Sequence, residues 1–254
     1  MLRRLTPAAV LLTAAVAACG GPTTPAINDP VEIISQGMEA TADATSFHMD
    51  LTLAGNVTIP ESGGSFNLEG TTASGDFDVE NEEGRLTFEV PALFDLSGEV
   101  LQIGTDSYVK SSLTGDTYSK TTTETGELPA DPSSAFAEIR DFLDDEGVET
   151  EKLADVNCGD RTCYAVRLTI PTEALPDGLQ AFGVDVGDML GDGLVLDLQF
   201  DRETLQLTQV STDLDAGELG TFGLLVTFSG YGETVDVSPP PSDQVTEGAP
   251  ALPF

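Results

Sequence analysis

The feature that most constrains the fold of this chain is a series of short segments in which apolar and polar residues alternate. In the first of them, residues 47–54, every second residue from Phe47 to Leu53 is apolar, and His48 lies on the polar side. Similar segments follow successive turns, around Phe66, Phe77 and Phe88. A period of two places neighbouring side chains on opposite faces of a strand. These segments therefore predict hairpin-linked antiparallel strands with one apolar face.

Further segments fit the same pattern, and the sheet is expected to have about ten strands. These segments are residues 100–103, 108–110, 148–156, 164–170, 194–200, 206–214, 224–229 and 234–237. By contrast, residues 113–132 are rich in Thr, Gly and Pro, and this composition predicts a long loop or a loosely held edge of the sheet.

Two segments have helical periodicity. Asp29 and Pro30 supply an N-cap and a proline at the first helical position. The helix expected over residues 31–44 has an apolar face at spacings of three and four, made of Val31, Ile34, Met38 and Ala42. A second helix is expected to begin at Ser133, and a short helical stretch at residues 172–182.

Two helices are too few to cover a flat sheet of this width. The predicted fold class is therefore α+β, with a strongly curved antiparallel sheet that wraps over the helices as a half-barrel and encloses an apolar cavity. A core filled by side chains is the alternative, and composition does not distinguish the two.

The N-terminus has the order of a secretory signal. Arg3 and Arg4 precede a short apolar run at residues 8–16, and Ala17 and Ala18 then precede Cys19. The run is too short for a comfortable permanent span, which needs about 20 residues. We expect residues 1–18 to be a lipoprotein signal peptide and Cys19 to become the lipid-modified N-terminus, with palmitate among its acyl groups. An ordinary secretory signal or an uncleaved anchor are the alternatives.

The composition makes nucleic acid an unexpected partner and gives little support to a bound metal ion. The chain has 10 Lys and Arg against 44 Asp and Glu, a formal net charge of −34. Such a surface repels phosphate backbones, so nucleic acid is not an expected partner. No Asp-x-Asp-x-Asp-Gly loop is present, so no metal site and no cofactor are predicted.

Two cysteines remain after the anchor. Cys158 and Cys163 flank Gly-Asp-Arg-Thr, a turn-forming tetrapeptide between strand-like segments. In an exported protein this arrangement predicts a disulfide across a hairpin; metal and redox readings are weaker because the spacing is not Cys-x-x-Cys.

Nothing in the sequence indicates catalysis. His48 is the only histidine, and it has no Gly-x-Ser-x-Gly elbow, Walker loop or zinc helix to accompany it. We expect His48 to be a surface or structural residue and the chain not to be an enzyme.

The order of elements and the closing segment resemble a known family. Residues 226–241 read Val-Thr-Phe-Ser-Gly-Tyr-Gly-Glu-Thr-Val-Asp-Val-Ser-Pro-Pro-Pro. With Cys19 and the Asp-Pro helix start, this segment resembles the LppX/LprAFG lipoproteins of mycobacteria and their relatives. The resemblance implies a half-barrel similar to the LolA and LolB carriers, with a cavity for acylated lipid or glycolipid.

The expected function is that of a cell-envelope lipoprotein, anchored by its lipid on the outward face of the cell membrane, that carries such lipid across the periplasmic space. Buried acyl chains need an apolar lining. The candidate lining residues are Met49, Leu51, Phe66, Leu68, Phe77, Phe88, Leu168 and Leu198. For each of them ordinary core packing is the alternative.

The expected organisation is a signal peptide at residues 1–18, a flexible tether at 19–29, the lipid-binding domain at 30–241 and a disordered tail at 242–254. A membrane transporter is left open as a further partner. The alternative function is a passive envelope or adhesion lipoprotein with a filled core and no ligand.

Overall fold

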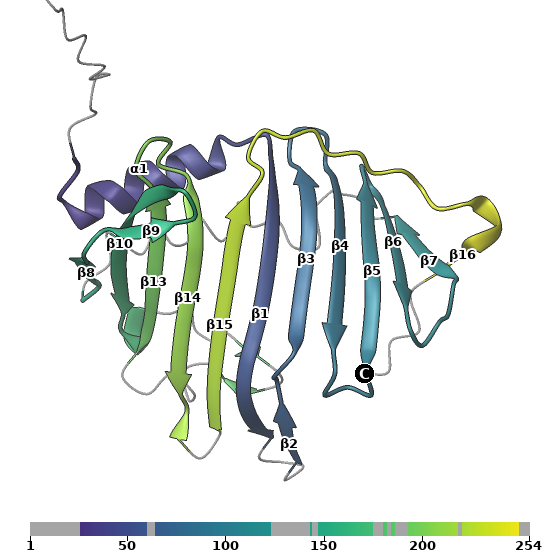
Figure 1. Cartoon of the computed structure of the whole chain (residues 1–254). Helices are drawn as coiled ribbons and strands as arrows, with labels where there is room; N and C mark the ends of the chain where they lie inside the picture. The colour runs from purple at the N-terminus through teal and green to yellow at the C-terminus, as the bar shows by residue number, and fades with distance from the viewer. Residues whose placement is uncertain are drawn as a thin grey trace, which may run out of the picture.

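Most of the strands expected from alternation are present, and they join in one sheet (Figure 1). The computed structural model describes residues 26–59, 64–122, 143, 147–174, 180–181, 184–185, 193–217 and 220–248, and every structural statement below concerns these residues. Cys19, the signal segment and residues 133–142 of the expected second helix lie outside them.

The first half of the sheet is formed by consecutive hairpins. Its strands are β1 (Ser46–Ile59), β2 (Gly64–Asn67), β3 (Thr71–Asp78), β4 (Glu83–Val90), β5 (Leu96–Ile103), β6 (Asp106–Ser111) and β7 (Tyr118–Thr122). Of the two alternatives for residues 113–132, a long loop or a loosely held edge, β7 fits the second, since only the short β16 lies outside it in the sheet. The Thr-rich sequence there forms a strand because both of its neighbours in the sheet satisfy its backbone.

The second half completes the sheet. Its strands are β8 (Glu149–Lys152), β9 (Val156–Cys158), β10 (Arg161–Ile170), β13 (Leu194–Asp201), β14 (Leu207–Asp215), β15 (Gly220–Ser229) and β16 (Val245–Glu247). A separate small pair is formed by β11 (Gln180–Ala181) and β12 (Val184–Asp185), and a 3-10 turn, η1, covers Thr172–Ala174.

The sheet has 14 strands rather than about ten, and it is curved and unclosed. Its order is β16-β7-β6-β5-β4-β3-β1-β15-β14-β13-β10-β8, with β2 on β1 and β9 on β10. All neighbours are antiparallel except β16, which runs parallel to β7. Strand β1 joins the halves, because it pairs with β3 on one side and with β15 on the other.

The single α-helix of the described residues, α1 (Pro30–Ala42), begins as expected. The Asp29 side chain accepts a hydrogen bond from the Val31 amide at 3.0 Å, and Pro30 follows. The buried face is shifted from the expected one: Ile33, Ile34 and Met38 are fully buried, whereas Val31 is exposed. The helix therefore has the expected apolar face, rotated by part of a turn.

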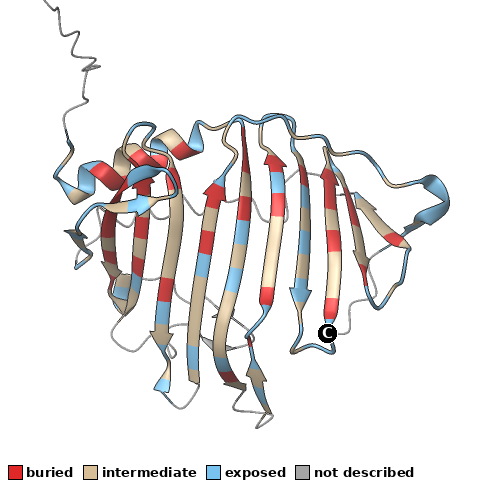
Figure 2. Cartoon of the chain, viewed as in Figure 1, coloured by how far each residue is buried: buried red, intermediate tan, exposed pale blue. Residues whose placement is uncertain are grey.

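Helix α1 covers one end of the apolar face of the sheet, where it contacts mainly β8, β10 and β14 (Figure 2). The buried Thr41 hydroxyl donates to the Gly37 carbonyl and accepts from the Leu207 amide at 2.8 Å. Gly37 lies directly against the Phe200 ring: a Cβ at this position would lie 2.3 Å from Cδ1 of Phe200. Helix and sheet thus approach as closely as a glycine permits.

The chain that follows β15 returns to the sheet. Residues 230–247, which we call the C-terminal strap, run along the strand ends, where the Gly232 amide donates to the Ser46 carbonyl at 3.0 Å (Figure 1). Val237 and Val245 then pack on Leu101, Tyr108 and Tyr118, a second apolar cluster. The predicted tail is corrected here for residues 245–247, which form β16, and the strand expected at 234–237 is absent. Residues 245–247 form a strand because they pair with the edge of β7, whose backbone groups would otherwise be unsatisfied.

We predict that Gly37→Ala lowers stability although alanine favours helices by about 1 kcal/mol over glycine. Overpacking against a rigid buried ring costs about 1–3 kcal/mol. Thermal and chemical unfolding measure the change, with Glu39→Ala on the exposed side of α1 as control. Equal or higher stability of Gly37→Ala would contradict the close packing described above.

We also predict that Val245→Asp detaches the C-terminal strap, because a charge cannot be accommodated beside Leu101 and Tyr118 without a partner. Acrylamide quenching of tyrosine fluorescence should rise, and stability should fall by about 1–3 kcal/mol. Gln244→Asp, one residue earlier and exposed, is the matched control and should leave both measurements unchanged.

Candidate functional site

The apolar face of the sheet is the principal candidate site. The register places Leu51 opposite Ala73 and Val226, and Ala73 opposite Phe88. Leu86 lies opposite Val100, which in turn lies opposite Val109. Directly opposite residues on neighbouring strands point to the same side. The apolar positions of successive strands therefore form one continuous surface.

From β6 across to β10, no paired residue on this face is charged within the described residues. The acidic residues of these strands occupy the alternate positions and point to the other face, as Asp50, Asp76 and Asp213 do. Although the chain has a net charge of −34, the charged side chains of these strands are thus separated from the apolar ones by the sheet. The face offers a surface suited to uncharged, apolar material.

The part of this face away from α1 is only half-buried. We call it the apolar platform, defined by Leu51, Leu53, Ala73, Leu86, Phe88, Val100, Val109 and Leu224. The Phe88 side chain packs directly over Gly98 on the neighbouring strand. A Cβ on Gly98 would lie 2.5 Å from Cζ of the Phe88 ring. Glycine at this position allows the ring to lie along the sheet instead of standing on it.

The eight predicted lining residues fall into three groups. Met49, Phe77, Leu168 and Leu198 are buried members of the packed cluster around α1, with exposed fractions between 0% and 8%. Leu51 and Phe88 belong to the half-buried apolar platform. Phe66 is half-buried on β2 opposite Val57, and Leu68 is buried just beyond it. Contact of any of them with a ligand remains a prediction.

The apolar cavity expected between sheet and helices is not confirmed. Two hollows of the described residues lie instead at the polar face. One groove of about 440 Å³ crosses β3 to β6, and its lining includes Ser74, Arg85, Glu99 and Lys110. Another, of about 430 Å³, lies beside the disulfide and includes Cys158, Arg161 and Gln209. Most lining residues of both hollows are polar or charged, which does not suit acyl chains.

Glu99 is the centre of a charged cluster in the first groove. Its carboxylate lies 2.5 Å from the Arg85 guanidinium and 3.3 Å from the Lys110 ammonium, and it accepts a hydrogen bond from the Tyr118 hydroxyl. Burial by itself favours the neutral carboxyl, but the Tyr118 hydrogen bond and the two cations outweigh it, so the pKa of Glu99 is lowered. The cluster is internally paired, which gives it a structural role beside Tyr118.

His48 lies on the polar face, on the side that the alternation predicts. Its Nδ1 is 2.7 Å from Asp76 and its Nε2 is 3.2 Å from Asp50, with the Ser74 hydroxyl 3.5 Å from Nε2. Partial burial opposes the charged ring, but the Asp76 hydrogen bond and both carboxylates outweigh it and raise the pKa of His48. Both ring nitrogens thus face carboxylates, and the Ser74 hydroxyl lies at the outer limit of hydrogen-bond distance from Nε2. These contacts tie β1 to β3 on the polar face of the sheet.

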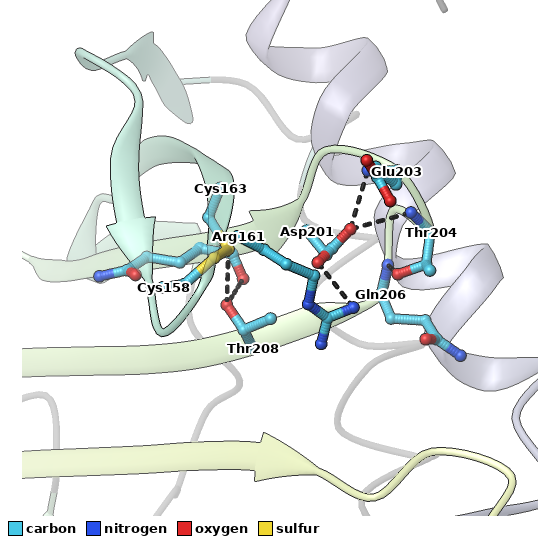
Figure 3. The surroundings of a disulfide bond; sticks show 9 residues. Cys158, Arg161, Cys163, Asp201, Glu203, Thr204, Gln206 and Thr208 are labelled. Carbon is cyan, nitrogen blue, oxygen red and sulfur yellow. Dashed lines mark hydrogen bonds and ion pairs between the residues drawn. A yellow bond between two sulfur atoms is a disulfide. The ribbon is translucent and has the colours of Figure 1, made fainter. Parts of the chain in front are cut away.

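The predicted disulfide is confirmed: Cys158 and Cys163 are bonded across the β9–β10 hairpin (Figure 3). The buried Asp201 lies beside them, close enough that its carboxylate and the two sulfurs could form a metal-ligand set. Both sulfurs are used by the disulfide, however, and Asp201 accepts from the Glu203 and Thr204 amides and pairs with Arg161 at 2.9 Å. These bonds give the group a structural role at the turn.

One cluster was not singled out by the sequence reasoning, although a signal for it exists. Val100 and Leu101 are consecutive apolar residues on β5, as are Tyr108 and Val109 on β6. Consecutive apolar residues in a strand indicate burial on both faces. The second face here is the one covered by the C-terminal strap.

No helix in the described part of the chain is long and apolar enough to cross a membrane.

No protein-family model and no curated protein matches this chain by sequence. Among solved structures, the chain is similar to the lipoprotein LppX of Mycobacterium tuberculosis, with 15% identity, a TM-score of 0.50, and coverage of 82% of this chain and 97% of LppX. It is also similar to LprF from Mycobacterium bovis, with 16% identity, a TM-score of 0.54, and coverage of 83% and 96%. The family resemblance stated from the sequence is thus confirmed at the level of the fold, which this chain shares with LppX and LprF.

Proposed function

We propose that this protein is an envelope lipoprotein, anchored through Cys19, that binds acylated lipid or glycolipid on its apolar face and carries it across the periplasmic space. The observation that carries the proposal is the uncharged face running from β6 to β10, of which α1 covers only one end. The fold shared with LppX, which is named as a lipoprotein, supports the envelope role.

The energetics favour an acyl chain as the ligand. Each buried CH₂ contributes about 0.8 kcal/mol, so ten buried groups contribute about 8 kcal/mol before the cost of immobilising the ligand. The apolar platform presents leucine, valine and phenylalanine side chains with no charge among them. A headgroup would lie at the border of the platform, where polar side chains and solvent can hydrate it.

The alternative is a passive envelope or adhesion lipoprotein with a filled core. The observation in its favour is that half of the predicted lining residues, including Leu168 and Leu198, are already packed within the cluster around α1. The apolar platform would then be covered by the chain itself. Either function needs no chemical transformation, and we propose that the protein is not an enzyme.

Lipid extraction separates the two functions. We expect organic extraction of the protein, purified from its native host, to release a defined acylated lipid that mass spectrometry identifies in near-stoichiometric amount. The matched control is Leu51→Asp purified in the same way, which should release much less. Absence of any specific lipid from the protein without substitutions would favour the passive alternative.

Adjacent residues on opposite faces provide a sharper test. We expect Phe88→Asp to reduce bound lipid about tenfold or more, since burying an unpaired carboxylate costs well over the 1.4 kcal/mol that a factor of ten represents. Thr87→Asp, on the polar face, adds the same charge and should leave bound lipid unchanged. Leu198→Ala should destabilise the fold by about 2–5 kcal/mol while the folded protein still binds lipid. Equal lipid loss in Phe88→Asp and Thr87→Asp would contradict binding on this face.

A further inference from the structure

Two neighbouring hairpin turns expose large apolar side chains. Phe94, in the β4–β5 turn, is 97% exposed, and Leu93 beside it is 36% exposed. Leu113, in the β6–β7 turn, is 54% exposed. We call these three residues the apolar tip. Single exposed apolar residues are common on protein surfaces, but here three of them lie on two neighbouring turns, and Phe94 at this exposure has no packing role in the fold.

The β4–β5 turn holds Phe94 in a defined position. The Leu93 amide donates to the Val90 carbonyl at 3.1 Å, and the Asp95 amide donates to the Pro91 carbonyl at 3.2 Å. Phe94 and Asp95 both have left-handed backbone conformations, with φ of 58° and 55°. Such a conformation costs a bulky residue about 1 kcal/mol, and glycine or asparagine would avoid most of that cost. Turn geometry therefore does not account for phenylalanine here.

The two turns are tied together at one end of the sheet. The Ser112 amide donates to the Ser97 carbonyl at 2.7 Å, and the Ser97 amide donates to the Ser112 hydroxyl at 3.2 Å. In Figure 1 the β4–β5 turn lies at the lower ends of the strands, whereas α1 lies along their upper ends. The apolar tip is thus a fixed projection at the end of the molecule opposite α1.

The apolar tip is continuous with the apolar platform. Val90 and Leu96 pair directly above the β4–β5 turn, on the same face as Phe88 and Gly98. A path of apolar residues therefore leads from Phe94 along β4 to the centre of the platform. A lipid bilayer takes up projecting apolar side chains at its surface without a preformed pocket, and it is also the source of the lipid that the proposed carrier binds.

We propose that Leu93, Phe94 and Leu113 insert into the surface of a lipid bilayer and position the apolar platform to exchange lipid with it. The proposal rests on the proposed lipid-binding function, whose platform the tip adjoins. Asp95 and Asp116 lie in the same two turns, and the chain has a net charge of −34. Bilayers with neutral or zwitterionic headgroups are therefore the partner, because anionic headgroups repel these carboxylates.

The absence of tryptophan from the chain allows a direct test. Phe94→Trp places a single reporter at the tip, and Leu225→Trp places one at a 40% exposed position on the polar face. Each full-length, lipid-anchored variant is reconstituted in phosphatidylcholine vesicles. Phosphatidylcholine with brominated acyl chains is supplied either in the anchoring vesicle or in a second vesicle population.

Tryptophan inserted among acyl chains is shielded from water and within reach of bromine. We expect Phe94→Trp emission to move to shorter wavelength and to be quenched at least about twofold more than Leu225→Trp in one of the two arrangements. Replacing half of the phosphatidylcholine with phosphatidylglycerol should reduce the quenching. Equal quenching of both reporters, or no quenching in either arrangement, would overturn the proposal. Absence of quenching is also the result expected if the tip binds a protein instead of a bilayer.

A second variant separates this proposal from the proposed function. Leu93→Ser combined with Phe94→Ser and Leu113→Ser should retain extractable lipid but transfer it between vesicles at least about tenfold more slowly, because the apolar contact with the bilayer is lost. Unchanged transfer would reject the apolar tip while leaving lipid binding intact. Quenching of Phe94→Trp without any extractable lipid would instead support the tip and reject the carrier function.

Discussion

The pairing of β1 with both β3 and β15 is the constraint on which the rest of the molecule depends. It joins two series of hairpins into one sheet and transmits a single register across it. A shift by one residue would turn Met49 and Leu51 to the polar face and bring Asp50 onto the apolar face. The separation of charge from apolar surface over the whole sheet thus follows from the hydrogen bonds of one strand.

The two faces of the sheet are completed by different parts of the chain. Helix α1 covers one end of the apolar face, and the C-terminal strap covers a smaller cluster at the other end of the polar face. The half-buried apolar platform lies on the apolar face, beside the part that α1 covers. Neighbouring side chains of the platform shield one another from water, so its partial exposure is tolerated. This partial exposure is what a filled core would lack.

The candidate site could be predicted in kind but not in its limits. Alternation identified Leu51 and Phe88 as apolar-face residues, and it identified Leu168 and Leu198 in the same way. Only the position of α1 makes the latter pair fully buried. The disulfide could be predicted because five positions separate its cysteines across a turn, a local relation. Phe94 could not, because exposure at a hairpin end depends on how the neighbouring hairpins are tied.

The sequence by itself determined the strand periodicity, the capped start of α1, the bridged hairpin at Cys158 and Cys163, and the side of the sheet on which each charge lies. These properties depend on residues close together in the chain. The tertiary structure decided the number of strands in the sheet, the return of residues 245–247 to the β7 edge, and the division of the apolar face into a covered and a half-buried part. Each of these depends on contacts between distant segments, whose free energy exceeds local preference only after the sheet has formed.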